Sequence, residues 1–234
     1  MSSTFLSAEW RKLLVFNYEV DKSVLDKYLP ANTELDLWNN TCYISLVGFM
    51  FLNTKLKGIK VPLHVNFEEI NLRFYVRHKE KRGVVFIKEI VPKRALTFVA
   101  NTLYKENYQT LSTSHKWIDE DDNLFVEYCW NPNNLMNIIS ANTSSVSVEI
   151  LPESEAEFIF EHYWGYTKIS ENKTSEYEVQ HPRWNVYSIK DHSIQVDFKN
   201  TYGEDFAFLN SEKPVSVFLA EGSEIRVMQG TQLK

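Results

Sequence analysis

The feature that most constrains the fold is a strict alternation of side-chain type along residues 68–78. A period of two over this length is typical of a β-strand with two chemically different faces. A short charged segment with Gly83 follows, and residues 84–91 are again mostly apolar, so we expect an antiparallel hairpin. One face of the first strand carries Ile70, Leu72, Phe74 and Val76, and the other carries Glu69, Asn71, Arg73, Tyr75 and Arg77. If the polar face turns inward, the interior holds a carboxylate and an arginine, and if it faces water it is an ordinary charged surface.

Most of the remaining pattern also predicts strands. Residues 41–52 have apolar side chains on both faces, which places this strand in the middle of a sheet. Residues 134–147 are polar and weakly patterned, and we expect a long loop or an ordered lid there. Further strands are expected at 13–18, 107–117, 124–130, 166–169, 177–180, 193–198, 215–220 and 224–228, and short helices at 22–29, 96–103, 154–163 and 201–209.

The chain shows no repeat, linker or shift in composition, so we expect a single domain over residues 1–234. The fold class is mainly β (α+β): a closed or strongly curved antiparallel barrel with a few short helices. The 15 Phe, 12 Tyr and 6 Trp against only 7 Gly favour broad packed sheet surfaces over glycine-rich nucleotide loops.

Charge and motifs exclude several functional classes. The net charge of -6 argues against nucleic acid and against an anionic membrane surface as partners. No dinucleotide, P-loop or nucleophile-elbow motif occurs, and no histidines or cysteines have metal-ligand spacing, so we expect neither a cofactor nor a metal. The N-terminus resembles no signal peptide and no apolar run reaches about 20 residues, so we expect a cytoplasmic protein with two unpaired thiols, Cys42 and Cys129.

The segment Glu89-Ile90-Val91-Pro92-Lys93-Arg94-Ala95-Leu96 resembles the lysine segment of the acetoacetate decarboxylase-like superfamily. In that superfamily a Glu is followed after a short gap by Tyr-Pro-Lys-Lys-Leu. The resemblance starts earlier, with Leu14-Val15-Phe16-Asn17-Tyr18-Glu19-Val20-Asp21 and Leu29-Pro30.

A closer resemblance is to the YqjF-like branch of that superfamily, which has no established activity. Three stretches carry it: Tyr43-Ile44-Ser45-Leu46-Val47-Gly48-Phe49, Phe67-Glu68-Glu69-Ile70-Asn71-Leu72-Arg73-Phe74-Tyr75-Val76, and Arg82-Gly83-Val84-Val85-Phe86. The first half of the chain matches well and the second half weakly. The resemblance implies a decarboxylase-like barrel with a central cavity.

The resemblance also implies site residues. Lys93 takes the place of the lysine that forms the Schiff base, and Arg94 takes the place of its cationic neighbour. An adjacent cation lowers the pKa of a lysine and so makes its amine nucleophilic. Glu68 or Glu69 corresponds to the cavity carboxylate, and only one of the two neighbours can face inward. The chain departs from the family at Arg94, which replaces a lysine, and at Val91, which replaces a tyrosine.

Two functional hypotheses follow. In the first, the barrel binds a small organic acid or carbonyl compound, with Arg73 and Tyr75 as ligand-binding residues and with Schiff-base chemistry at Lys93. In the second, the same cavity serves a non-catalytic carrier, sensor or scaffold. The alternative that Lys93 and Arg94 are solvated residues of a first helical turn stays open, as does a homo-oligomer.

Overall fold

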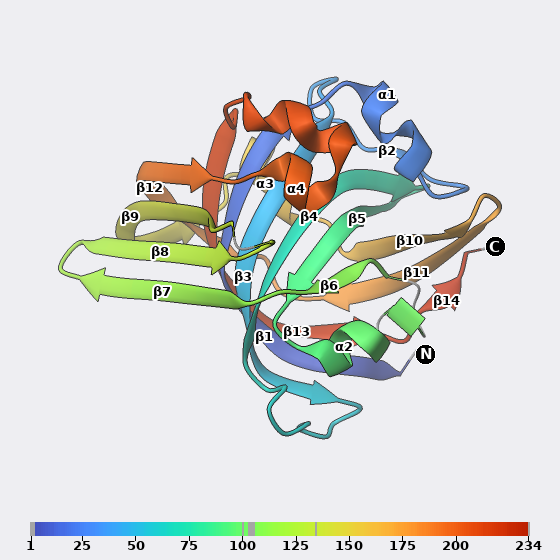
Figure 1. Cartoon of the computed structure of the whole chain (residues 1–234), viewed down its shortest axis with the longest axis horizontal. Helices are drawn as coiled ribbons and strands as arrows, with labels where there is room; N and C mark the ends of the chain where they lie inside the picture. The colour runs from blue at the N-terminus through green and yellow to red at the C-terminus, as the bar shows by residue number, and fades with distance from the viewer. Residues whose placement is uncertain (1–2, 100, 103–105, 134, 234) are drawn as a thin grey trace.

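Most of the chain lies in β-strands of one continuous, strongly curved sheet (Figure 1). The computed structural model describes residues 3–99, 101–102, 106–133 and 135–233. The strands are β1 (Thr4–Glu19), β2 (Glu34–Leu35), β3 (Tyr43–Leu56), β4 (Phe67–His78), β5 (Lys81–Val91), β6 (Tyr108–Thr110), β7 (Thr113–Glu120), β8 (Asn123–Trp130), β9 (Asn137–Glu149), β10 (Trp164–Ser170), β11 (Lys173–Gln180), β12 (Asn185–Gln195), β13 (Ser216–Met228) and β14 (Thr231–Gln232). The helices are α1 (Lys22–Leu25), α2 (Arg94–Val99), α3 (Glu155–Phe160), α4 (Phe198–Tyr202) and the 3-10 helices η1 (Asp26–Tyr28) and η3 (Glu204–Asn210).

The sheet closes on itself. Successive neighbours run β11-β10-β5-β4-β3-β1-β13, and β13 also pairs with β11, which completes a ring. All pairs in the ring are antiparallel except β10 and β5, which are parallel. The expected closed barrel is therefore confirmed, with this one parallel contact as a refinement. Beyond β13 the sheet continues through β12, β9, β8 and β7, which extend to one side of the ring in Figure 1.

The strands β1, β3 and β4 separate two hydrophobic cores. On β3, Ile44, Leu46 and Met50 belong to the core shared with β8, β9 and α4. The alternate residues Val47 and Phe49 belong to the second core, together with α3 and with β11. The prediction that residues 41–52 are covered on both faces is confirmed, because this strand lies between two packed layers.

The hairpin of β4 and β5 forms as expected, with His78 opposite Lys81 across its turn. Helix α3 forms within the expected range 154–163, and the Ser154 side chain caps its start by accepting a hydrogen bond from the Glu157 backbone amide. A helix also forms within 96–103 as α2, although residues 100 and 103 lie outside the described residues.

The expectation of a loop or lid at 134–147 is wrong, because most of that stretch is β9. Its pattern of Asn, Thr and Ser gives little strand signal, yet β9 pairs with β8 on one side and with β12 on the other. Two flanking strands satisfy its backbone groups, and this tertiary context outweighs the weak local preference.

Among the described residues, none of the helices has the length and apolar character needed to cross a membrane.

Candidate functional site: an enclosed cavity with a buried arginine and three glutamates

A cavity of about 300 Å³ lies inside the ring. Most of its lining is apolar, and many of the lining residues also belong to the second hydrophobic core. Helix α2 contributes Ala95 and Leu96, and helix α3 contributes Ile159 and Phe160. The aromatic lining residues are Phe5, Trp10, Phe49, Phe51, Phe67, Phe86, Tyr108, Phe160, Trp164, Tyr177 and Trp184.

The polar face of β4 turns into this cavity. Glu69, Asn71 and Arg73 all line it, while the intervening Ile70 and Leu72 pack in the other core. The choice that the sequence left open between an inward and a solvated polar face is therefore settled by the structure in favour of the inward one.

The two neighbouring glutamates lie on opposite faces of β4. Glu68 accepts hydrogen bonds from the Thr113 hydroxyl at 2.8 Å and from the His115 ring at 2.6 Å, outside the cavity. Glu69 lines the cavity and is only 3% exposed. Of the two carboxyl groups that the family resemblance implies, Glu69 is thus the one inside the ring.

Arg73 is a buried cation without a direct ion pair within the described part of the chain, although its charge acts at longer range on Glu69 and partly offsets the effect of burial on the pKa of that carboxyl group. It is 9% exposed, its Nε is buried without a hydrogen-bond partner, and no ion pair joins it to another described residue. Its guanidinium carbon lies 5.8 Å from the centre of the Tyr75 ring. Since guanidinium groups form paired hydrogen bonds with carboxylates, Arg73 provides an anion-binding group inside an apolar cavity.

Tyr75 is fully buried beside this site but does not line the cavity. Its hydroxyl lies 2.7 Å from the Ser45 hydroxyl, and its ring packs against Phe158 and His162. The structure therefore brings Tyr75 next to Arg73, where it supports the guanidinium through its ring.

Three glutamates from different segments meet in the cavity lining: Glu69 on β4, Glu89 on β5 and Glu106 before β6. We call them the acidic cluster. Asn71 Nδ2 donates to Glu69 Oε1 at 3.1 Å, and the Tyr108 hydroxyl donates to its other oxygen at 3.3 Å. The Thr167 hydroxyl donates to Glu106 at 2.6 Å.

Burial raises the pKa of each carboxyl group in the acidic cluster. The pKa of Glu69 rises to about 7, mainly through burial and further through the negative charge of Glu106. Burial likewise raises the pKa of Glu106 to about 7, and the pKa of Glu89 is raised by burial and by its two acidic neighbours. The cluster therefore holds protons near neutral pH, which an exposed glutamate would not.

His162 also lines the cavity, and the charge of Arg73 acts on it. Its Nε2 is 3.1 Å from an Asp36 oxygen, which also accepts a hydrogen bond from Arg82 at 2.6 Å. Burial lowers the pKa of His162 to about 4, so the ring is neutral at physiological pH. Its Nδ1 is buried without a partner.

Unpartnered polar atoms concentrate around the cavity. Eleven buried side-chain nitrogen or oxygen atoms of the described residues have no hydrogen-bond partner, and six of them belong to residues that line the cavity. Because buried polar groups in native proteins are nearly always paired, this concentration indicates a site that a polar ligand or water completes. The six are Trp10 Nε1, Thr54 Oγ1, Asn71 Oδ1, Arg73 Nε, Glu89 Oε2 and His162 Nδ1.

Lys93 and Arg94 lie at the start of α2, directly after β5 and Pro92. Lys93 is half-buried and Arg94 is exposed, and neither belongs to the cavity lining, although Ala95 and Leu96 of the same turn do. The Schiff-base role of Lys93 stays a prediction.

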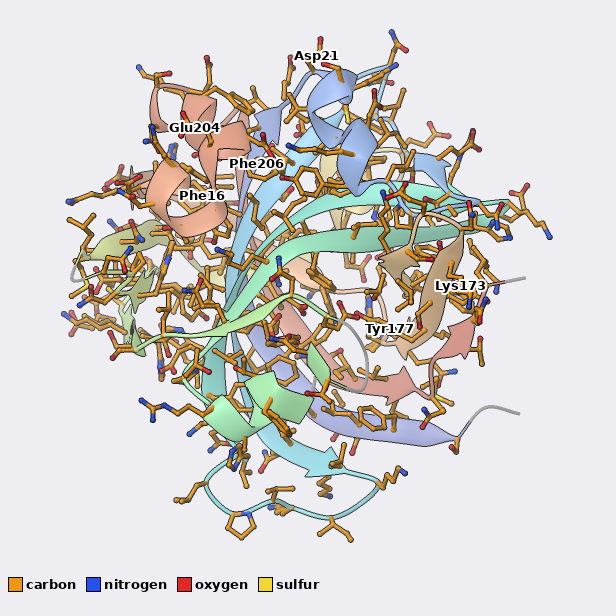
Figure 2. The ribbon with its side chains drawn as sticks, turned by 45° about the vertical axis from the view of Figure 1, so that its right-hand side comes forward. Phe16, Asp21, Lys173, Tyr177, Glu204 and Phe206 are labelled. Atoms are coloured by element: carbon orange, nitrogen blue, oxygen red, sulfur yellow. The ribbon has the colours of Figure 1, made fainter. Side chains whose placement is uncertain are left out.

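Several lining residues escaped the sequence analysis, namely Glu89, Glu106, Tyr108, His162, Tyr177 and His181. Glu89 faces the cavity because the register of β4 against β5 shifts between Leu72 and Arg73, which places Glu89 opposite Asn71. A regular hairpin counted back from its turn would place Lys88 there instead, so the sequence pattern alone could not identify Glu89. Glu106 and Tyr108 reach the cavity because β6 pairs with β5 beyond helix α2, and the others lie on later segments that join β5 and β13 in the ring. Figure 2 labels Tyr177, on β11.

The ring of strands and the mainly apolar cavity with its few buried charged groups are features of a protein with the acetoacetate decarboxylase-like fold. The structure superposes on acetoacetate decarboxylase from Legionella pneumophila with a TM-score of 0.69 and 13% identity, covering 99% of this chain and 88% of that one. It superposes on an acetoacetate decarboxylase-like enzyme from Sphingomonas wittichii RW1 with a TM-score of 0.67 and 10% identity, covering 99% and 94%. For the enduracididine biosynthesis enzyme MppR complexed with pyruvate, the TM-score is 0.69 at 11% identity, covering 100% and 92%. Identities this low establish the fold and no shared activity.

The chain belongs to the family DUF2071, an uncharacterized conserved protein family, whose model matches residues 7–224. It is also 33% identical over 100 residues to the uncharacterized protein YqjF of Bacillus subtilis (strain 168). That alignment covers 42% of this chain and 41% of the relative. The resemblance stated from the sequence is thereby confirmed at the level of family and fold.

Proposed function

We propose that this protein binds a small organic acid inside the ring, with the ligand carboxylate on Arg73. The observation that carries the proposal is the buried guanidinium of Arg73, which has no direct ion pair with the described residues and an unpartnered Nε in a mainly apolar cavity. A buried charge without a partner destabilises a protein, and a bound carboxylate would supply the partner. A cavity of about 300 Å³ suits a ligand of a few carbon atoms.

The test is a binding titration with small monocarboxylates, including pyruvate and butanoate, followed by calorimetry or NMR. We expect Arg73→Gln to weaken binding about tenfold to a hundredfold, because a charge-assisted hydrogen bond contributes about 1.5–3 kcal/mol. Arg77→Gln is the matched control: Arg77 lies on the same strand but is exposed and pairs with Glu34 at 2.9 Å. Equal affinity of Arg73→Gln and wild type would refute the role of Arg73.

Catalytic and non-catalytic versions of this function differ at Lys93. Since Lys93 lies outside the cavity lining, the geometry favours a carrier or sensor over a Schiff-base enzyme. Borohydride reduction in the presence of pyruvate or acetoacetate, followed by intact mass and peptide mapping, separates the two versions. We expect no adduct on Lys93. An adduct that maps to Lys93 and disappears in Lys93→Ala would instead establish the catalytic version.

A further inference from the structure

The acidic cluster leaves the cavity with an imbalance of charge. Its described lining includes the three glutamates and one arginine, and no lysine. Arg73 does not neutralise the cluster by direct contact, because no ion pair joins it to any of the three. His162 and His181, the histidines nearest to Arg73, have a pKa lowered by burial and add no positive charge at neutral pH.

Excess buried negative charge can be neutralised in two ways, by bound protons or by a cation from the ligand. Burial raises the pKa of Glu69 and of Glu106 to about 7, so protons are one way of neutralising the cluster near neutral pH. A ligand cation would compete with those protons and replace them.

Two oxygens, one in the acidic cluster and one on the neighbouring Asn71, have no hydrogen-bond partner among the described residues, and both accept hydrogen bonds once Glu89 is ionised. Asn71 Oδ1 and Glu89 Oε2 are buried without a partner, in side chains 1% and 3% exposed that both line the cavity. An ammonium group carries three donors and no acceptor, so it matches a set of oxygens of this kind.

Aromatic rings next to the cluster favour an organic cation. Tyr108 and Tyr177 line the same cavity, and the Tyr108 hydroxyl donates to Glu69. Burial raises the pKa of both phenols, and the nearby charges of the acidic cluster raise it further. Aromatic faces attract ammonium groups, most strongly where water is excluded. By contrast, the described residues contain no group of three or more His, Cys, Asp or Glu side chains placed to hold a metal ion.

We propose that the cavity ligand is an amino acid whose ammonium group is separated from its carboxylate by several carbon atoms, with the ammonium in the acidic cluster and the carboxylate on Arg73. The separation follows from the strand, because Glu69 and Arg73 lie four residues apart on one face of β4 and their backbones are therefore roughly 13 Å apart. This inference rests on the proposed function and specifies its class of ligand.

The experiment compares matched pairs of probes that differ only in the amino group: 5-aminopentanoate with pentanoate, and 4-aminobutanoate with butanoate. We expect each amino acid to bind wild-type protein at least tenfold more tightly than its partner at pH 7.5. Calorimetry in two buffers of different ionisation enthalpy should show proton release for the amino acid only, because its ammonium displaces protons from the cluster.

Single substitutions identify which carboxyl groups bind the ammonium group. In Glu69→Gln and Glu106→Gln the affinity for 5-aminopentanoate relative to that for pentanoate should fall at least fivefold, whereas the affinity for pentanoate itself should stay unchanged. Glu68→Gln is the matched control on the opposite face of β4, and it should keep the wild-type ratio of the two affinities. Thermal unfolding confirms that each variant is folded, and loss of a buried charge gives no reason for the two cavity variants to unfold earlier.

The outcomes separate this inference from the proposed function. Two results would overturn the inference and leave the proposed function standing. In the first, pentanoate binds through Arg73 but the amino group adds no affinity. In the second, 5-aminopentanoate still binds more tightly than pentanoate by the wild-type factor in both Glu69→Gln and Glu106→Gln. If neither probe of a pair binds and Arg73→Gln changes nothing, the proposed function itself fails.

Discussion

Glu68 and Glu69 are neighbours in sequence with opposite electrostatic environments. Burial raises the pKa of Glu69 to about 7. Burial also acts on Glu68, but hydrogen bonds from His115 and Thr113 outweigh it and hold the pKa of Glu68 below its usual value. The alternation of the strand creates this difference, because one side chain enters the cavity and the other meets polar partners outside it.

This difference predicts how stability depends on pH. A carboxyl group whose pKa is raised from 4.5 to about 7 by folding is protonated in the folded protein at pH 5 and must be ionised at pH 8. The folded protein therefore loses stability as the pH rises from about 4.5 to 7, and the loss is complete above pH 7. We expect Glu69→Gln to change the free energy of unfolding little at pH 5 and to raise it by about 1–3 kcal/mol at pH 8.

Urea unfolding of Glu69→Gln and of the wild-type protein at pH 5 and pH 8 measures this difference in the free energy of unfolding. Glu68→Gln is the control with the opposite sign: its lowered pKa means that the ionised form is stabilised by folding, so the variant should lose stability at pH 8. If Glu69→Gln changed the free energy of unfolding equally at pH 5 and pH 8, the raised pKa of Glu69 would be contradicted.

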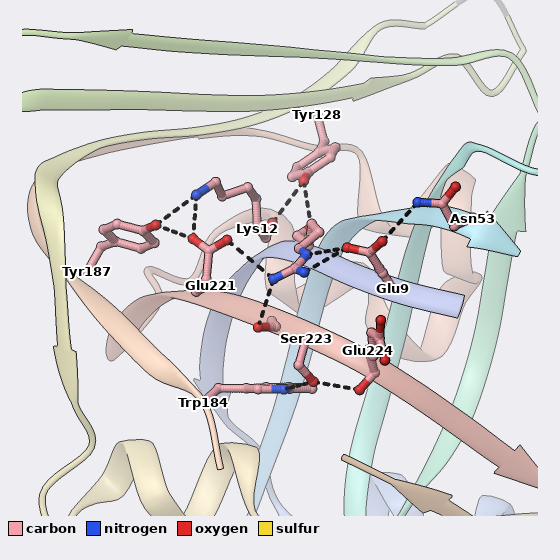
Figure 3. A network of polar contacts seen from close by, with 11 residues as sticks. Glu9, Lys12, Asn53, Tyr128, Trp184, Tyr187, Glu221, Ser223 and Glu224 are labelled. Atoms are coloured by element: carbon pink, nitrogen blue, oxygen red, sulfur yellow. Dashed lines mark hydrogen bonds and ion pairs between the residues drawn. The ribbon is translucent and has the colours of Figure 1, made fainter. Parts of the chain in front are cut away.

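At the scale of elements, the pairing of β1 with β13 depends on an irregularity opposite Gly222. The register of β1 against β3 shifts between Arg11 and Leu14, and Lys12 has φ of 54°. Around this irregularity, Lys12 donates to the Tyr187 hydroxyl at 2.7 Å and forms an ion pair with Glu221 at 2.5 Å (Figure 3). A β-bulge of this kind strengthens the local twist, which a closed ring requires.

Gly222 itself admits no side chain. Its φ is 81°, and a Cβ atom there would lie 1.9 Å from the Trp10 carbonyl oxygen. We expect Gly222→Ala to lower the free energy of unfolding by more than about 3 kcal/mol, because backbone strain adds to a clash with another backbone.

Gly58→Ala is the matched control for this substitution. Gly58 has φ of 82°, but a Cβ atom there would meet nothing within 4 Å. Its substitution should cost only the strain of the left-handed backbone, about 1 kcal/mol. Chemical denaturation of the two variants isolates the clash as their difference, and equal losses would show that the close approach of β1 and β13 is not needed.

At the scale of the whole molecule, ring closure decides the site. Closure depends on β13, which pairs with β1 along almost its whole length and with β11 through Val179 and Gln180. These partners are distant in sequence, so no local pattern reports their contact. When the ring closes, β11 completes the cavity lining with Tyr177, whereas Glu106 is placed by the separate pairing of β6 with β5.

The sequence by itself determined the strands and turns of β3, β4 and β5, the cap of α3 and the family, because alternation, turn residues and capping are local signals. It also limited the inward carboxyl group to Glu68 or Glu69. Only the tertiary structure decided that Glu69 faces the cavity, that β9 is a strand, and that Lys93 lies outside the cavity lining. The physical reason is that burial depends on which segments cover a face, and those segments lie outside any local pattern: β12 pairs with β9 across several tens of residues, and β13 pairs with β1 from the other end of the chain.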